Sequence, residues 1–237
     1  MKHLPLTLGI ARPSGSLRSS GPSVSVGTAG VSVLTPELKK AVLDRDSGVC
    51  QCCGFKADRY QDVHFIDQNP KNLVMSNLAT TCIFCHQCFN MDQATLMRSG
   101  VLVWLPEISQ VDLHHIMRAV YVARISQGPM AEAARTTLDG VMARREEARR
   151  RIQTDDPYVL STVLKDFLTG RYYAERAERL DGIRLLPLDR RLIKEADLEF
   201  NQFPQILAYW RSKDGPFGDR APTLWTNLYK NTLKTVA

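Results

Sequence analysis

Six cysteines are confined to two short stretches of this 237-residue chain, and their spacing constrains the fold more than any other feature. The first stretch holds Cys50, Cys52 and Cys53, and the second is the segment Cys82–Cys88. Two cysteines separated by two residues can bind one ion from a single backbone turn, and two such pairs complete the tetrahedral shell of a structural zinc site. The spacing therefore predicts a Zn²⁺ ion that ties the two stretches together.

The ligand set is open at one position. The expected ligands are Cys50, Cys53, Cys82 and Cys85. Cys88 forms a second, overlapping pair with Cys85 and is the alternative ligand. Cys52 lies within the first turn, just before Gly54, and is expected to be a bystander. The competing interpretation is a set of buried free thiols that pack as small apolar side chains, and it does not explain two pairs at this separation.

The redox environment is predicted from the absence of an export signal. No apolar run approaches the roughly 18 residues of a membrane span, and "LPLTLGIA" near the N-terminus is too short for a convincing signal peptide. Clustered cysteines in such a chain favour metal binding in a reducing compartment over disulfides.

Composition divides the chain into four segments. Residues 12–32 are rich in Ser, Gly and Pro, so we expect a flexible arm over 1–34. The zinc-binding unit is expected over 35–108 and a helical region packed on it over 109–211. Residues 212–237 are expected to be a linker and tail.

Hydrophobic periodicity and turn signals predict an α+β fold that is mainly α. A helix is expected to begin at Thr35-Pro36, and "DVHFI" and "LVMSNLATTC" predict a hairpin before the second cysteine stretch. A strand is expected at 101–106, followed by a helix that Ser109 caps. The remainder is predicted helical, including a last helix over 189–211 that is broken or kinked at Pro204.

The net charge of +6 does not by itself predict a nucleic-acid partner. Much of the charge lies in "RREEARRR", residues 144–151, where acidic side chains are interleaved with the arginines. This pattern is typical of a solvated helix face.

The order of "RDSGVCQCCG", "VHFI", "NL" and "CIFCH" resembles the zinc-containing HNH, or ββα-metal, nuclease fold over residues 36–90. The resemblance implies that His64, Asn77 and His86 stand at family positions for the catalytic metal site. Phe65 stands where the family has its general base, and a phenyl ring cannot accept a proton. The resemblance therefore implies a small HNH-like ββα zinc-binding unit with a degenerate active site and no catalytic residues.

A narrower resemblance spans residues 34–190. "VLDRDSGVCQCCGFKADRYQDV", "NLATTCIFCHQCF", "VLVWLPEISQVDL" and "IRLLP" together are similar to the IcmJ/DotN family of type IVB secretion systems. It implies a non-enzymatic subunit of the coupling complex that binds the C-terminal extension of a DotL-like coupling ATPase. DotM-like and adaptor subunits are the other implied partners, and the complex gathers substrates for export. The implied location is cytoplasmic, peripheral to the inner membrane through that complex.

Two rival functions stay open at this point. One is a metal-dependent HNH endonuclease in which His64 or His86 acts as the base, and the other is a zinc module that binds nucleic acid. Trp104, Leu105 and Tyr121 are either anchors of a partner surface or core residues. His114 and His115 are expected to be ordinary helix residues.

Overall fold

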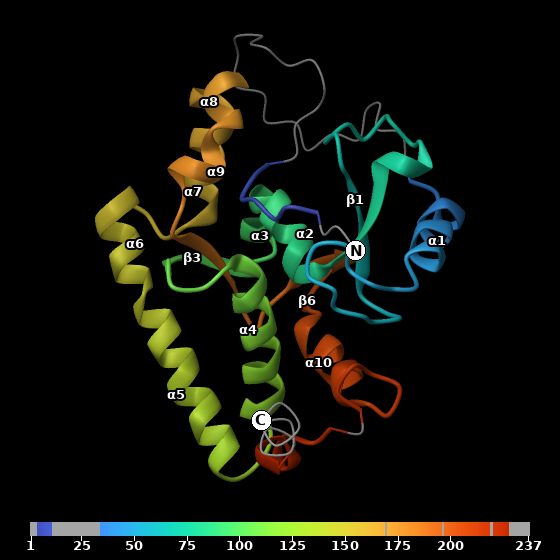
Figure 1. The fold of residues 1–237 in the computed structure, drawn as a ribbon, viewed down its shortest axis with the longest axis vertical. Helices are drawn as coiled ribbons and strands as arrows, with labels where there is room; N and C mark the ends of the chain where they lie inside the picture. The colour runs from blue at the N-terminus through green and yellow to red at the C-terminus, as the bar shows by residue number, and fades with distance from the viewer. Residues whose placement is uncertain (1–3, 11–33, 169, 196, 219, 228–237) are drawn as a thin grey trace, which may run out of the picture. The chain divides into compact units, whose positions relative to one another are not determined.

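The structure is a computed structural model that describes residues 4–10, 34–168, 170–195, 197–218 and 220–227 (Figure 1). Helices joined by small antiparallel sheets make up these residues, which confirms the predicted mainly helical α+β class. The chain forms two compact units. Unit 1 comprises residues 1–94 and 157–181, and unit 2 comprises 95–156 and 182–237.

This division differs from the contiguous segments that the sequence predicted. Strand β3 (Gly100–Trp104) pairs antiparallel with β4 (Ile183–Pro187), although about 80 residues separate the two strands. The chain leaves unit 2 after Asp156 and returns to it at Gly182. A pairing between distant segments leaves no local signal in the hydrophobic pattern, which is why β4 was not predicted as a strand.

The elements of unit 1 begin with the predicted helix and hairpin. Thr35 caps α1 (Pro36–Arg45) by accepting a hydrogen bond from the Leu38 N–H. Strand β1 (Gln61–Phe65) pairs antiparallel with β2 (Leu78–Cys82) through the 3₁₀ turn Met75–Asn77. The helices that follow are α2 (Ile83–Phe89), α3 (Met91–Leu96), α7 (Pro157–Thr162) with the π-helical turn Val163–Phe167, α8 (Gly170–Ala174) and α9 (Arg176–Arg179).

Residues 4–10 are held against unit 1 by backbone hydrogen bonds. The Gly9 N–H donates to the Cys88 carbonyl at 2.8 Å, and the Gly9 carbonyl accepts from the Met91 N–H at 3.1 Å. The Tyr173 hydroxyl accepts from the Ile10 N–H at 3.1 Å. The N-terminal segment thus spans the junction between α2 and α3.

The expectation of a flexible arm is therefore wrong for residues 4–10. Leu8 and Ile10 are buried, and removing these apolar side chains from water offsets the entropy lost on ordering the segment. The rest of the predicted arm, residues 11–33, lies outside the described residues.

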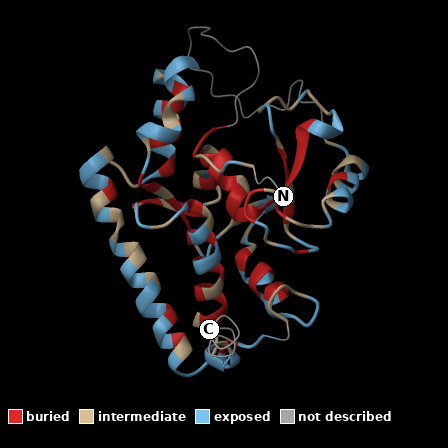
Figure 2. Cartoon of the chain, in the orientation of Figure 1, coloured by how far each residue is buried: buried red, intermediate tan, exposed pale blue. Residues whose placement is uncertain are grey.

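Unit 2 is built around the long helix α4 (Gln110–Arg124), which Ser109 caps as predicted. Helix α4 packs against β4, α5 (Pro129–Ala143) and α10 (Phe203–Arg211). Figure 2 shows buried residues concentrated along α4 and α10. The remaining elements are α6 (Arg145–Ile152), β5 (Leu192–Glu195), β6 (Leu198–Asn201) and the 3₁₀ turn Pro222–Leu224.

The β3–β4 sheet is closed by contacts at both edges. The side-chain amide of Gln110 donates to the Leu185 carbonyl at 2.8 Å and accepts from the Leu185 N–H at 2.9 Å. On the other edge, the Leu102 N–H donates to the Asp155 carbonyl. The Gln110 side chain thus replaces a neighbouring strand.

The predicted helix over 189–211 is wrong in its first half. Residues 192–195 and 198–201 form the antiparallel strands β5 and β6, and helix begins only at Phe203. Pro204 occupies the first turn of α10, where its missing N–H breaks no hydrogen bond, so it starts the helix rather than kinking it.

The aromatic residues of the α4 region belong mainly to the core. Leu105 and Tyr121 are buried, and the Tyr121 hydroxyl donates to the Pro187 carbonyl at 2.6 Å. Trp104 is partly buried and stacks under the Arg151 guanidinium, 3.9 Å from the ring centroid. The core interpretation holds for Leu105 and Tyr121.

None of the helices in the described ranges combines the length and apolar character that crossing a bilayer requires.

Candidate metal centre

The first cysteine pair lies in a tight turn that follows α1. The Cys50 N–H donates to the Phe55 carbonyl, and the Gly54 N–H donates back to the Cys50 carbonyl, both at 2.9 Å. Gly54 has a φ of 72°, in the left-handed region that favours glycine. These bonds curl the backbone so that the side chains of Cys50 and Cys53 leave the turn on the same side.

The second pair lies where β2 ends and α2 begins. Cys82 is the last residue of β2 and the N-cap of α2, and its Sγ accepts a hydrogen bond from the Cys85 N–H at 3.4 Å. Cys85 follows in the first turn of the helix. A change from strand to helix thus brings two sulfurs separated by two residues to the same point.

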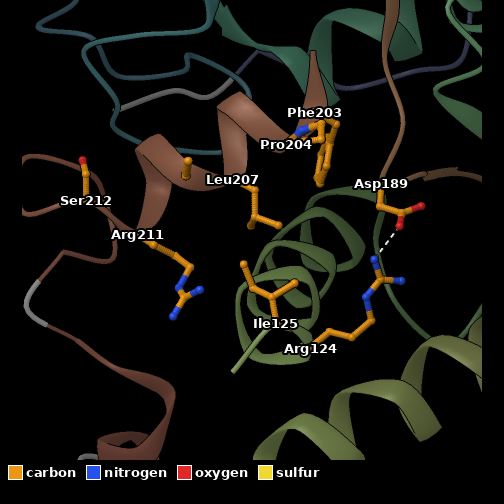
Figure 3. Close-up of a pocket in the computed structure, with 9 residues that line it drawn as sticks. Arg124, Ile125, Asp189, Phe203, Pro204, Leu207, Arg211 and Ser212 are labelled. Atoms are coloured by element: carbon orange, nitrogen blue, oxygen red, sulfur yellow. Dashed lines mark hydrogen bonds and ion pairs between the residues drawn. The ribbon is translucent and has the colours of Figure 1, made fainter. Parts of the chain in front are cut away.

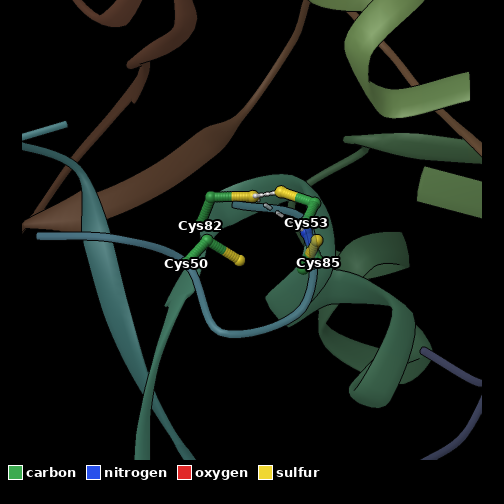
Figure 4. Close-up of side chains that lie close together, drawn as sticks. All are labelled: Cys50, Cys53, Cys82 and Cys85. Carbon is green, nitrogen blue, oxygen red and sulfur yellow. Dashed lines mark hydrogen bonds between the residues drawn. The ribbon is translucent and has the colours of Figure 1, made fainter. Parts of the chain in front are cut away.

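The two pairs meet in a single cluster. All four Sγ atoms lie within 4.8 Å of one another, and the Sγ atoms of Cys53 and Cys82 are 3.7 Å apart. Figure 4 shows the four side chains converging from the turn and from the β2–α2 junction. Zn–S bonds of about 2.3 Å in a tetrahedron require sulfurs about 3.8 Å apart. The cluster therefore fits a tetrahedral metal ion, and all four cysteines are buried.

The thiols of Cys50 and Cys85 hold their protons more tightly than a free cysteine does. Hydrogen bonding, first with Cys52, raises the pKa of Cys50 to about 12. The hydrogen bond with Cys50 is likewise the first cause that raises the pKa of Cys85 well above its ordinary value. Both of these thiols therefore favour the protonated form. A bound divalent cation reverses that preference, since coordinated thiols are deprotonated.

The two remaining cysteines are buried outside the four-sulfur group. The Cys88 thiol lies 3.5 Å from the Phe84 carbonyl oxygen, to which it donates, and burial raises the pKa of Cys88 well above its ordinary value. Cys52 hydrogen-bonds with Cys50 and Cys85, so it lies closer to the cluster than a bystander needs to. The geometry groups Cys85, rather than Cys88, with the other three cysteines.

The HNH-like positions are distributed over the hairpin and α2. His64 is buried on β1 and stacks on Phe89 of α2, with ring centroids 3.9 Å apart and planes inclined by 14°. Burial is the main cause that lowers the pKa of His64 to about 4, and the nearby His86 lowers it further. His64 is therefore a neutral imidazole at neutral pH.

Asn77 is engaged in the loop between β1 and β2. Its side-chain amide donates to Asp67 Oδ1 at 2.8 Å and to the Asn72 carbonyl at 2.9 Å, and its Oδ1 accepts from the Asp67 N–H at 2.9 Å. These three hydrogen bonds fix the loop, so the polar atoms of Asn77 have a structural use.

Phe65 packs against an apolar cluster formed by Val42, Val63 and Leu78. Successive side chains of a strand point to opposite faces, so Phe65 lies on the face away from His64. The sequence signal for this position was the residue type alone, and the packing adds that the surroundings are apolar.

The sequence prediction missed one structural contributor beside the cluster. Residues 4–10 cross the end of α2, and the Leu4 N–H donates to the Gln51 carbonyl at 2.8 Å in the first cysteine turn. The apolar residues of "LPLTLGIA" were the available signal, but they were considered only as a leader sequence.

No family model matches the chain. The chain is 29% identical over 164 residues to the type 4 apparatus protein DotN of Legionella pneumophila subsp. pneumophila (strain Philadelphia 1). The alignment covers 67% of this chain and 76% of that relative. Together with the motifs "NLATTCIFCHQCF" and "VLVWLPEISQVDL", this similarity supports membership of the chain in the DotN/IcmJ family.

Proposed function

We propose that this protein is a non-enzymatic structural subunit of a type IVB secretion coupling complex. In this role it binds the C-terminal extension of the coupling ATPase and helps to recruit substrates, together with DotM-like and adaptor subunits. The observation that carries the proposal is the similarity to a type 4 apparatus protein over 67% of the chain. The corresponding location is the cytoplasmic side of the inner membrane, reached through the complex.

We further propose that the cluster holds Zn²⁺ through Cys50, Cys53, Cys82 and Cys85. Four thiolates form a closed tetrahedral shell, and such a shell leaves no open position for water or substrate. The ion would join the turn after α1 to the β2–α2 junction and so stabilise unit 1. Its role is structural.

The absence of nuclease activity is part of the proposal, and the surroundings of Phe65 support it. A general base must reach a water molecule near the reacting phosphate, whereas the Phe65 side chain packs among apolar residues. The base position is therefore occupied by a residue that contributes to the core.

The alternative function is a metal-dependent HNH endonuclease. The neighbouring His64 and His86 favour it, because either imidazole could accept a proton. The basic segment supports it less, since the arginines there form ion pairs within the chain. The pairs are Arg144–Glu107, Arg145–Asp155, Arg149–Asp155, Arg150–Glu147 and Arg151–Glu147. An arginine paired in this way must give up its acidic partner before it can neutralise a phosphate and release a counterion from the nucleic acid.

The test is co-purification of the full chain from cells that express its own secretion system, with mass spectrometry of the partners and metal analysis of the product. We expect the coupling ATPase and tetrahedral zinc. A parallel plasmid-cleavage assay with added Mg²⁺ or Mn²⁺ is expected to show no cleavage.

Two results would reverse these conclusions. Cleavage that requires a divalent ion and is abolished by His64→Ala would show that the protein is an HNH endonuclease. Recovery of the chain without any secretion component, at native expression and physiological salt, would contradict the proposal that it is a subunit of the coupling complex.

A further inference from the structure

A groove lies on unit 2 between the C-terminal end of α4 and one side of α10 (Figure 3). Its cavity volume is about 500 Å³. The lining combines an apolar floor with charged ends, and it consists of Arg124, Ile125, Asp189, Phe203, Pro204, Leu207, Ala208, Arg211 and Ser212. The metal cluster contributes no residue to it, so the groove is a separate feature.

The α10 side of the groove has the spacing of a helix-binding face. Leu207 and Ala208 lie three and four residues after Pro204, and Arg211 lies four and three residues after them, which is the spacing of one helix face. Pro204 and Ala208 are exposed and small, so a second helix can approach the backbone of α10 closely.

The α4 side contributes an exposed apolar residue. Ile125, at the C-terminal end of α4, is 45% exposed although it faces the groove. The floor of the groove includes Phe203, whose ring is held in place by edge-on packing against two other rings. The ring centroid of Phe203 lies 5.2 Å from that of Tyr121 and 6.0 Å from that of Trp210. An apolar side chain of a partner could therefore bind in the space between this preformed floor and the exposed isoleucine.

The charged side chains at the groove favour a partner of one sign of charge. Arg124 is ion-paired with Asp189. Arg211 extends over the groove in Figure 3, and within the part of the chain that the structure describes no acidic side chain forms an ion pair with it. The side chains that line the groove therefore carry one positive charge in excess, located beside the apolar floor.

We propose that this groove binds an amphipathic helix of a partner protein, with an apolar residue between Ile125 and Leu207 and an acidic residue facing Arg211. Helix-in-groove recognition uses this combination of an apolar stripe and flanking charge. The inference rests on the proposed function, since it assigns a docking surface to a subunit of a multiprotein complex.

Charge argues against an occupant from the chain itself. Residues 228–237 contain two lysines and no aspartate or glutamate, so they repeat the sign of Arg211. A second copy of the chain carries a net charge of +6 and is equally poorly matched. An acidic helix in another protein complements the groove better.

The experiment replaces Ala208 with the photo-crosslinking residue p-benzoylphenylalanine in the full chain, expressed with its own secretion system. Gln205→p-benzoylphenylalanine is the matched control, because Gln205 is exposed on α10 but does not line the groove. We expect crosslinks from position 208, and not from 205, to a segment of another protein with helical apolar spacing and net negative charge.

The crosslinked segment is then synthesised as a fluorescent peptide and titrated with the full chain. We expect Arg211→Glu to weaken binding about tenfold and the Gln205→Glu control to leave it unchanged within about twofold. A peptide whose acidic residues are replaced by lysine is expected to regain affinity for the Arg211→Glu variant.

The outcomes separate this inference from the proposed function. Secretion components that co-purify without any crosslink at position 208 would overturn the groove assignment and leave the structural role intact. Crosslinks from position 208 to residues 228–237 or to a second copy of the chain would also overturn it. A crosslink to a basic segment, or binding insensitive to Arg211→Glu, would contradict the charge argument.

Discussion

The Sγ atoms of Cys53 and Cys82 lie 3.7 Å apart although 29 positions separate the two residues in the chain. This contact joins the turn after α1 to the start of α2, and the hairpin between them brings its ends together. An ion bound there would close a long loop, which is where a crosslink constrains the unfolded chain most.

Cysteine substitutions test the ligand set. Cys53→Ser is expected to lose about one equivalent of metal and several kcal/mol of stability, because metal binding and folding are coupled in thiolate sites. Cys88→Ala is the matched control, since Cys88 is equally buried but outside the four-sulfur group. It is expected to keep the metal. Metal content by mass spectrometry and thermal unfolding measure both, and metal loss in Cys88→Ala alone would reassign the second pair.

Restoring a histidine at the HNH-like base position is expected not to restore a nuclease. Phe65→His places an imidazole in the apolar cluster of Val42, Val63 and Leu78, at a cost of about 1–3 kcal/mol, and gives no metal-dependent DNA cleavage. Phe65→Leu keeps the apolar contact and is expected to cost less than about 1.5 kcal/mol. Plasmid nicking by the histidine variant would show that this position can reach substrate.

Stability is expected to fall with acidification as His64 becomes protonated. The pKa of His64 is about 4 in the folded protein and about 6.5 in the unfolded chain, so the unfolded chain binds more protons between these values. The contribution of the neutral His64 to the free energy of unfolding is therefore complete above pH 6.5 and amounts to about 3 kcal/mol. It is lost as the pH falls towards 4.

The comparison with His64→Gln isolates this contribution. Protonation of the cysteine ligands weakens both proteins in acid, so it cancels in the difference between their free energies of unfolding. That difference is expected to vary with pH only between about 4 and 6.5. A difference that does not vary with pH would contradict the burial of a neutral His64.

Gly182, the residue before β4, is expected not to tolerate a side chain. Its φ is +83°, and an added Cβ would lie 2.4 Å from the ring of Trp104. Gly182→Ala should cost about 2–4 kcal/mol by combining backbone strain with a steric clash. Gly140→Ala, in the last turn of α5 with no atom within 4 Å of the added Cβ, should gain up to about 1 kcal/mol. Chemical denaturation measures both, and equal effects would contradict the packing of Trp104.

The local features of this protein can be predicted from its amino-acid sequence. The cysteine spacing predicted the cluster at residues 50–85, the alternation around His64 predicted β1, and Ser109 predicted the start of α4. Each signal depends on residues within a few positions of one another, so hydrophobic periodicity, capping chemistry and ligand spacing are sufficient to read it.

The pairing of distant segments, by contrast, follows from packing in the folded protein. The β3–β4 sheet joins residues 100–104 to 183–187, residues 4–10 lie along the α2–α3 junction, and Cys85 rather than Cys88 joins the other sulfurs. These outcomes depend on backbone hydrogen bonds and apolar burial between parts of the chain that are far apart. Their energies belong to the assembled fold, which the local pattern of the sequence does not encode.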